Sequence, residues 1–125
     1  MSLEGQLLDQ KSLRIITGKT ADWDELAKDC VAFANATGGH FLLGIEDGQD
    51  EPPPEQRIPV QLPDTIRRRM GELTVNLSVL PDVVTACNGG QYIDLGIPRS
   101  LAVASTTDGR FYLRLADQSK PVTGD

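Results

Sequence analysis

The stretch from Asp22 to Asp47 constrains the fold of this 125-residue chain more than any other part. Asp22 and Glu25 have the spacing of a capping box, in which a side-chain acceptor is followed three residues later by an acid. Apolar residues then recur at helical spacing: Leu26, Cys30, Phe33 and Ala34. We expect Lys28 and Asp29 on the other face, so the pattern predicts an amphipathic helix.

The residues that follow predict a tight helix end and a buried strand. Gly38-Gly39 stands where a left-handed residue ends a helix most easily. Phe41 to Ile45 is a nearly continuous apolar run bounded by turn residues. Such a run suits a strand that is covered on both faces, as in the centre of an α/β sheet.

The remaining elements are less regular. Leu13 to Ile16 is predicted as a strand, and Leu7-Leu8 as the start of the same edge. Gly48 to Gln56 contains three consecutive prolines and is predicted as an exposed loop. A second helix is expected from Asp64 to Leu73, just after Pro63.

The C-terminal part is predicted to be mostly strands. Three are expected at 83–87, 91–97 and 101–105, and Asp108-Gly109 is a hairpin turn that joins the last of them to 111–115. The order is β-α-β-α-β-β-β-β. The expected fold class is α/β (α+β), a mixed sheet with two main helices.

Composition places the chain among globular proteins, with 39% apolar and 24% charged residues. We expect one domain over 4–125, with Met1 to Leu3 a vector remnant and the chain an N-terminal piece of a longer protein. No apolar run approaches the roughly 18 residues of a membrane span, and the start lacks a secretory signal. A cytoplasmic location is therefore expected. Cys30 and Cys87 form no metal-type pair, and a disulfide between them stays open.

Charge limits the function classes. The formal net charge is −6. Tight non-specific binding to a polyanion draws on many Lys and Arg contacts to phosphates, so this charge argues against it. A local basic face remains compatible with the sequence.

Three segments together resemble the Schlafen AlbA-like domain, also called the divergent AAA domain. The first is Glu4 followed by Leu8-Asp9-Gln10-Lys11, which resembles the family's opening acid and its Glu-Phe-Lys signature. The second runs from Ala32 to Gly39 and into Leu43-Gly44-Ile45-Glu46-Asp47. The third, Gly109 to Arg114, is similar to a terminal strand in which an aromatic residue precedes an arginine. Asp9-Gln10 departs from the signature's Glu-Phe, and 71–90 matches no part of it.

The resemblance implies two kinds of function. Many bacterial members look like DNA-binding modules at the front of transcription-regulator-like proteins. Eukaryotic relatives use a similar fold to cleave RNA with three acids that hold a divalent metal. Glu4, Asp9 and Asp47 have spacings similar to that trio (9 − 4 = 5 and 47 − 9 = 38). The implied ion is Mg²⁺ or Mn²⁺, which two or three carboxylates can hold and which can activate water.

Further candidate residues are basic. Lys11 lies two residues from Asp9, so both point to one side of a strand; Lys11 could complete a catalytic site, touch a phosphate, or pair with the acids. Arg67-Arg68-Arg69 and Arg114 are candidate nucleic-acid contacts. Each feature has an ordinary structural alternative: turn chemistry for Asp47, an exposed ion pair for Asp9 and Lys11, and a solvated helix face for the arginines.

Two other motifs are not supported as sites. His40 is the sole histidine and has no nucleophile motif around it, so a structural role is expected. Gly38-Gly39 follows a helix and precedes a strand, the reverse of a phosphate-binding loop. ATP binding is therefore not supported.

The sequence leaves three hypotheses. The first is a nucleic-acid-binding regulatory domain that recognises DNA or RNA. The second is a metal-dependent ribonuclease that uses Glu4, Asp9 and Asp47, with Lys11. The third is a protein-interaction domain that keeps only the fold, which the acidic charge favours. Whether the chain forms a homodimer, and which C-terminal domain follows it, stays open.

Overall fold

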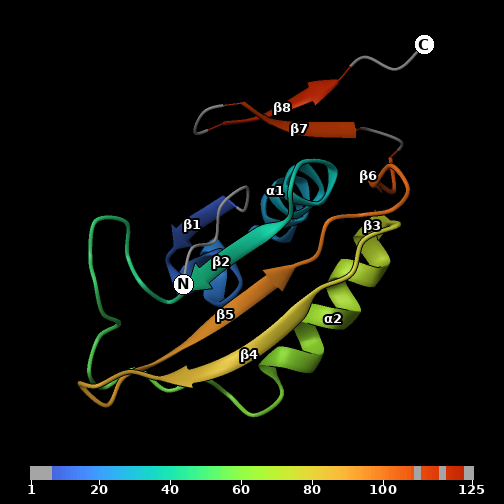
Figure 1. The fold of residues 1–125 in the computed structure, drawn as a ribbon. Coiled ribbons are helices and arrows are strands. Elements are labelled where there is room, and N and C mark those ends of the chain that lie inside the picture. Colours follow the sequence, from blue (N-terminus) through green and yellow to red (C-terminus); the bar gives the residue numbers. More distant parts are fainter. Residues whose placement is uncertain (1–6, 109–110, 116–117, 123–125) are drawn as a thin grey trace.

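The computed structural model describes residues 7–108, 111–115 and 118–122, the last two segments as backbone only. The elements in chain order are β1 (Leu7–Lys11), η1 (Leu13–Ile15), η2 (Gly18–Thr20), α1 (Trp23–Asn35), β2 (Gly39–Leu43), α2 (Leu62–Leu73), β3 (Thr74–Val75), β4 (Leu80–Thr85), β5 (Gln91–Ile97), β6 (Ser105–Thr106), β7 (Phe111–Leu115) and β8 (Gln118–Val122). Figure 1 shows them along the chain.

Four strands form the main sheet, in the order β1-β2-β5-β4. β1 runs parallel to β2, with Asp9 opposite Phe41 and Lys11 opposite Leu43. β5 is antiparallel to both β2 and β4. The predicted mixed sheet with two helices, and with it the α+β fold class, is confirmed.

The helix α1 begins as the sequence predicts. The Asp22 carboxylate accepts a hydrogen bond from the Glu25 N–H at 3.1 Å, which satisfies one of the free donors of the first turn. The reciprocal half of the capping box is absent: the Asp22 N–H donates to the Ile15 carbonyl at 2.7 Å, and the Glu25 carboxylate pairs with Lys28, 3.0 Å away. After the helix, Gly38 adopts φ +76° and turns the chain into β2, as its position predicts.

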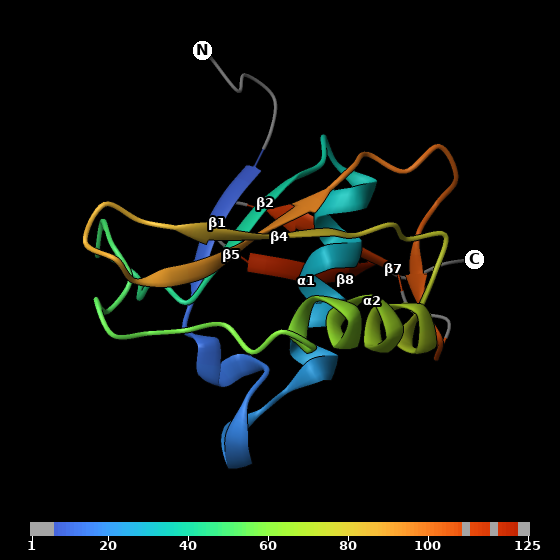
Figure 2. The ribbon, with the colours of Figure 1, turned by 90° about the horizontal axis from the view of Figure 1, so that it is seen from below.

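The core lies between the sheet and the two helices, which occupy the same side of the sheet (Figure 2). Phe33 of α1 stacks on Phe41 of β2 with ring centroids 4.2 Å apart. Ile66 and Met70 of α2 are fully buried in the same cluster. Since α1 also packs against β7, nearly every position in the second half of α1 is buried.

The expectation that β2 is covered on both faces is wrong. Phe41 and Leu43 are buried, whereas His40 and Leu42 between them are only half-buried. Among the described elements, none lies over the side of the sheet opposite α1 and α2 (Figure 2). The run from Phe41 to Ile45 has apolar residues at positions that face both sides of the sheet. For that reason the sequence predicted a covering layer on each side.

Four local predictions are corrected. Leu13 to Ile15 forms a 3-10 turn rather than a strand, begun by the Ser12 hydroxyl, which accepts from the Arg14 N–H. The edge strand is β1 instead. The expected strand at 101–105 is reduced to β6, which pairs with β3, and β7 pairs with β8 rather than with 101–105. The predicted helix at Asp64 begins two residues earlier, at Leu62.

No helix within the described ranges combines the length and apolar character needed to cross a bilayer.

Candidate functional site

The parallel pairing of β1 with β2 sets the end of β1 beside the chain that follows β2. Parallel strands end on the same side, so the residues after β2 lie beside the end of β1. The Gly44 N–H donates to the Lys11 carbonyl at 2.8 Å, which continues the pairing beyond the strands. The strand-end site is defined here by Asp9, Lys11, Arg14, Glu46 and Asp47.

Asp9 lies inside β1, half-buried, on the same side of the strand as Lys11. One of its carboxylate oxygens, Oδ1, accepts a hydrogen bond from the Gln10 N–H at 2.9 Å. This bond orients the carboxylate along the strand.

Lys11 forms an ion pair with Asp29, a residue that the sequence pattern predicted on the solvent face of the helix. Its Nζ lies 2.8 Å from Oδ2 of Asp29 on α1, with side-chain exposures of 18% and 6%. The ammonium also lies 5.6 Å from the centre of the Phe41 ring, within cation–π range. Lys11 therefore ties the end of β1 to α1.

The assignment of Asp29 to the solvent face is wrong, since the residue is only 4% exposed. Leu26, Asp29 and Phe33 follow one another at steps of three and four, so helical spacing alone puts Asp29 beside the apolar stripe. That spacing, with a lysine on a neighbouring strand, was the available signal for the pair.

The thiol next to this pair is also affected. Cys30 is fully buried. Burial raises the pKa of the Cys30 thiol far above its ordinary value, the Asp29 carboxylate raises it further, and the Lys11 ammonium acts in the opposite direction. A nucleophilic role for Cys30 is therefore disfavoured, because the thiolate is the reactive form.

The two acids that follow β2 are exposed. Glu46 lies 3.5 Å from the Arg14 guanidinium, a long surface contact of small energetic weight. Asp47 is exposed in the adjoining turn. The side chains at this edge therefore include at least two that solvent and a ligand can reach.

The proposed metal trio is only partly within the described residues. Glu4 lies outside them. Among the residues that are described, no group of three or more His, Cys, Asp or Glu side chains could hold a metal ion. Because Glu4 lies outside the described residues, the metal trio of Glu4, Asp9 and Asp47 stays a prediction.

The three arginines of α2 diverge, as their helical spacing predicts. Arg67 pairs with Asp64 at 2.8 Å and Arg69 with Glu72 at 3.4 Å. Arg69 also lies over the Trp23 ring at 5.5 Å. Arg68 is the exposed member without such a partner in the described part of the chain. Arg114 belongs to β7, and its side chain is outside the described residues.

His40 has a partner that the sequence did not indicate. Its Nδ1 lies 2.7 Å from Oδ1 of Asp94 on β5, on the side of the sheet away from the helices. The two residues are diagonal neighbours across β2 and β5. Only the sheet register could identify this pair.

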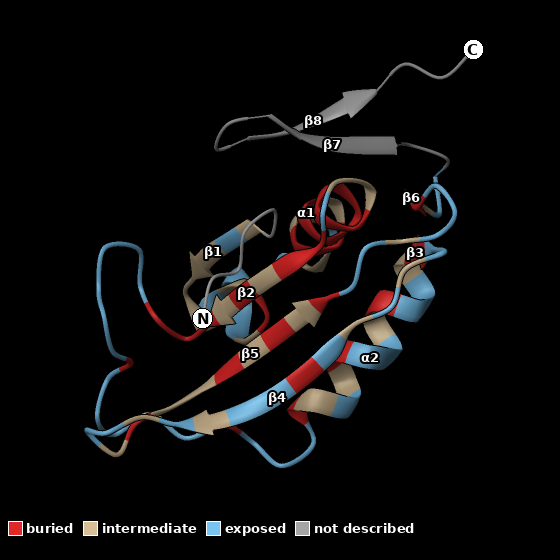
Figure 3. Cartoon of the chain, in the orientation of Figure 1, coloured by how far each residue is buried: buried red, intermediate tan, exposed pale blue. Residues whose placement is uncertain are grey.

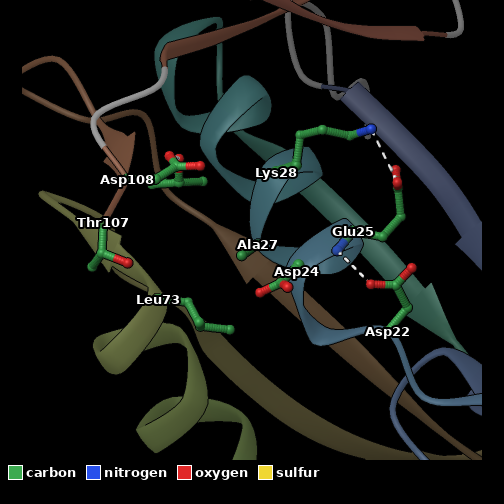
Figure 4. Close-up of a pocket in the computed structure, with 9 residues that line it drawn as sticks. Asp22, Asp24, Glu25, Ala27, Lys28, Leu73, Thr107 and Asp108 are labelled. Carbon is green, nitrogen blue, oxygen red and sulfur yellow. Dashed lines mark hydrogen bonds and ion pairs between the residues drawn. The ribbon is translucent and has the colours of Figure 1, made fainter.

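A separate hollow of about 490 Å³ lies at the start of α1 (Figure 4). Its acids are Asp22, Asp24, Glu25 and Asp108. Three of these are already engaged, since Asp22 caps α1, Glu25 pairs with Lys28, and Asp108 accepts a hydrogen bond from the Thr106 hydroxyl. None of the predicted site residues within the described part of the chain lines this hollow.

Comparison with known proteins places the chain in a family. The family model described as "Schlafen, AlbA_2" matches residues 4–123. The DIP2311 protein from Corynebacterium diphtheriae, known from a crystal structure, superposes with a TM-score of 0.62 at 22% identity, over 94% of this chain and 25% of that one. This chain thus spans about a quarter of that protein's length, and the likeness concerns the fold. A search of curated proteins found no match.

Proposed function

The chain belongs to the Schlafen AlbA_2 family, and from that membership we propose that it is a nucleic-acid-interacting regulatory domain of a longer, transcription-regulator-like protein. The parallel β1–β2 pairing is the observation that carries the proposal. It sets the end of β1, with Lys11 and then Arg14, beside Glu46 and the other residues that follow β2.

The charges of the strand-end site determine how a nucleic acid can bind there. The strand-end site holds three acids and two bases, and Lys11 is already neutralised by Asp29. A phosphate therefore meets repulsion there unless a cation bridges it to the carboxylates. We expect nucleic-acid affinity to rise with Mn²⁺ or Mg²⁺ and to fall steeply with monovalent salt.

A second candidate, a divalent-metal-dependent ribonuclease, uses the same edge. It would employ Glu4, Asp9 and Asp47 as metal ligands. The pairing of β1 with β2 favours it, because Asp9 lies on β1 and Asp47 follows the end of β2. A bound ion there would supply an activated water and stabilise charge on the scissile phosphate.

One set of assays separates the two candidates. The full chain is incubated with tRNA, single-stranded RNA, single-stranded DNA and duplex DNA, in Mn²⁺ or in EDTA, and both gel shift and cleavage are followed. Shift without cleavage supports the binding domain, and Mn²⁺-dependent cleavage supports the ribonuclease. Neither shift nor cleavage on any substrate would reject both.

Matched variants locate the interaction. Arg14→Gln removes an exposed base at the strand-end site. Arg99→Gln is the control: it removes an exposed base just after Ile97, at the end of β5 that lies away from this site. Each lost phosphate contact lowers the slope of log affinity against log salt by about one. We expect this for Arg14→Gln and not for Arg99→Gln; equal effects would contradict binding at this edge. Asp47→Asn, compared with Asp50→Asn, tests the acids for cleavage in the same way.

A further inference from the structure

The face of the main sheet turned away from α1 and α2, here called the open face, carries several apolar side chains. Figure 3 colours the chain by burial, and each of the four strands has exposed or half-buried positions. Leu8 on β1 and Leu80 on β4 are each 61% exposed. Leu42, Val84 and Tyr92 between them are only half-buried. The sheet register puts Leu8, His40, Gly96 and Leu80 in one row across all four strands.

The next row carries two acids side by side. Asp82 of β4 is directly opposite Asp94 of β5. Like charges in this position destabilise a strand pair, since the two side chains are close neighbours. The Asp94 carboxylate has a hydrogen-bonding partner in Nδ1 of His40, 2.7 Å away, whereas Asp82 is exposed and has no ion pair within the described residues. The sheet therefore retains an uncompensated negative charge among exposed apolar side chains.

This charge decides between occupants. A second copy docked face to face would set Asp82 and Asp94 against another acidic pair, which like-charge repulsion opposes. A nucleic acid is opposed for the same reason, because no Lys or Arg of β1, β2, β4 or β5 lies on this face: Lys11 points to α1. A basic segment with apolar flanks complements both the acids and the exposed leucines.

We propose that the open face is a docking surface for a basic, partly apolar protein segment, whose arginine or lysine pairs with Asp82 and Asp94. Extended segments present alternate side chains to one side, so a strand-like peptide could place its charge over the acids and its apolar residues over Leu42 and Tyr92. This surface is distinct from the strand-end site and does not depend on the nucleic-acid proposal.

The test uses the full chain and a short blocked peptide of alternating arginine and valine as the probe, with binding followed by amide chemical shifts in NMR titrations. Shifts are expected on β2, β4 and β5. A peptide of alternating arginine and serine is expected to bind about tenfold more weakly, because it lacks the apolar contribution.

Matched variants exclude general attraction to an acidic protein. Asp82→Asn with Asp94→Asn is expected to weaken binding about tenfold, as for two exposed ion pairs. Asp50→Asn with Glu51→Gln removes the same charge from the exposed loop after β2 and is expected to change binding less than twofold. Equal weakening by both pairs, shifts outside the open face, or no binding up to about 1 mM peptide would overturn the proposal.

Discussion

The Lys11 ammonium of β1 lies 2.8 Å from the Asp29 carboxylate of α1, and both side chains are largely shielded from water. β1 is an edge strand that pairs only with β2. The ion pair therefore supplies a polar tie between this edge strand and the helix layer, in addition to the apolar contacts of Leu7.

Removing one partner of this pair should be strongly destabilising. Asp29→Ala leaves the Lys11 charge shielded and uncompensated, and we expect it to lower the free energy of unfolding by about 3–5 kcal/mol. Glu25→Ala, which breaks the more exposed pair with Lys28, should cost under about 1 kcal/mol. Urea unfolding followed by circular dichroism measures both. A loss of less than 1 kcal/mol for Asp29→Ala would show that the pair contributes little.

The stability of the protein should fall at alkaline pH because of Cys30. Burial, and then the Asp29 carboxylate, raise the pKa of this thiol. Above pH of about 8.5, the ordinary thiol pKa, the unfolded chain releases the Cys30 proton while the folded chain keeps it. The stabilisation is thus complete below that pH and is lost above it, by about 1.4 kcal/mol per pH unit.

Unfolding of the wild type and of Cys30→Ala at pH 8, 9 and 10 isolates this effect. The variant should be less stable at pH 8, because it leaves a small cavity, but should show a shallower decline. Cys87 is exposed, so Cys87→Ala should keep the wild-type decline. Parallel declines in all three proteins would contradict the assignment to Cys30.

Position 39 should accept only glycine, because Phe33 and Leu7 pack too closely against it to leave room for a side chain. A Cβ there would lie 2.7 Å from Cδ2 of Phe33 and against the Leu7 carbonyl oxygen. Gly39→Ala should therefore separate β1 from β2 or displace α1, and we expect a loss of about 1–3 kcal/mol. Gly71→Ala is the control: a Cβ there meets nothing within 4 Å, and in a helix it should stabilise by about 0.5–1 kcal/mol. Thermal unfolding of both variants checks the opposite signs.

Asn35 should hold the segment before β6 in place. Its amide group donates to the Ala104 carbonyl at 2.9 Å and accepts from the Ala104 N–H at 2.7 Å. Asn35→Ala removes both bonds, and we expect a loss of about 1–3 kcal/mol. Hydrogen exchange should rise at Ala104. Asn88→Ala, which removes a similar pair of bonds to Pro52 and Gly90, should leave exchange at Ala104 unchanged.

The sequence correctly predicted those elements that depend on residues close together in the chain. Asp22 caps α1 as its spacing predicts, Gly38 takes the left-handed conformation, and β5 has its predicted limits, Gln91–Ile97. In each case the physical cause lies within a few residues: a free N–H to satisfy, a φ that favours glycine, or an alternating apolar pattern.

The predictions were wrong where residues far apart in the chain determine the local structure or the contacts of a side chain. Leu13 to Ile15 is apolar enough for a strand, but Ser12 caps it as a turn and β1 takes the edge. The segment 101–105 pairs only at Ser105, with Val75 of β3. Of the candidate site residues, Asp9 and Lys11 do share one side of β1 as predicted, while the partners of Lys11 and His40 depend on α1 and on the β2–β5 register.

By itself, the sequence determined the helix from Asp22, the glycine pair and the strand after it, the two-helix mixed-sheet class, and the family. These follow from local backbone preferences and from residue order. Only the tertiary structure decided that Asp29 is buried against Lys11, that the residues after β2 lie beside the end of β1, and that β2 has one face without a covering element among those described. Those facts depend on strand order, register and the side on which the helices pack, because the same local pattern is compatible with several arrangements in space.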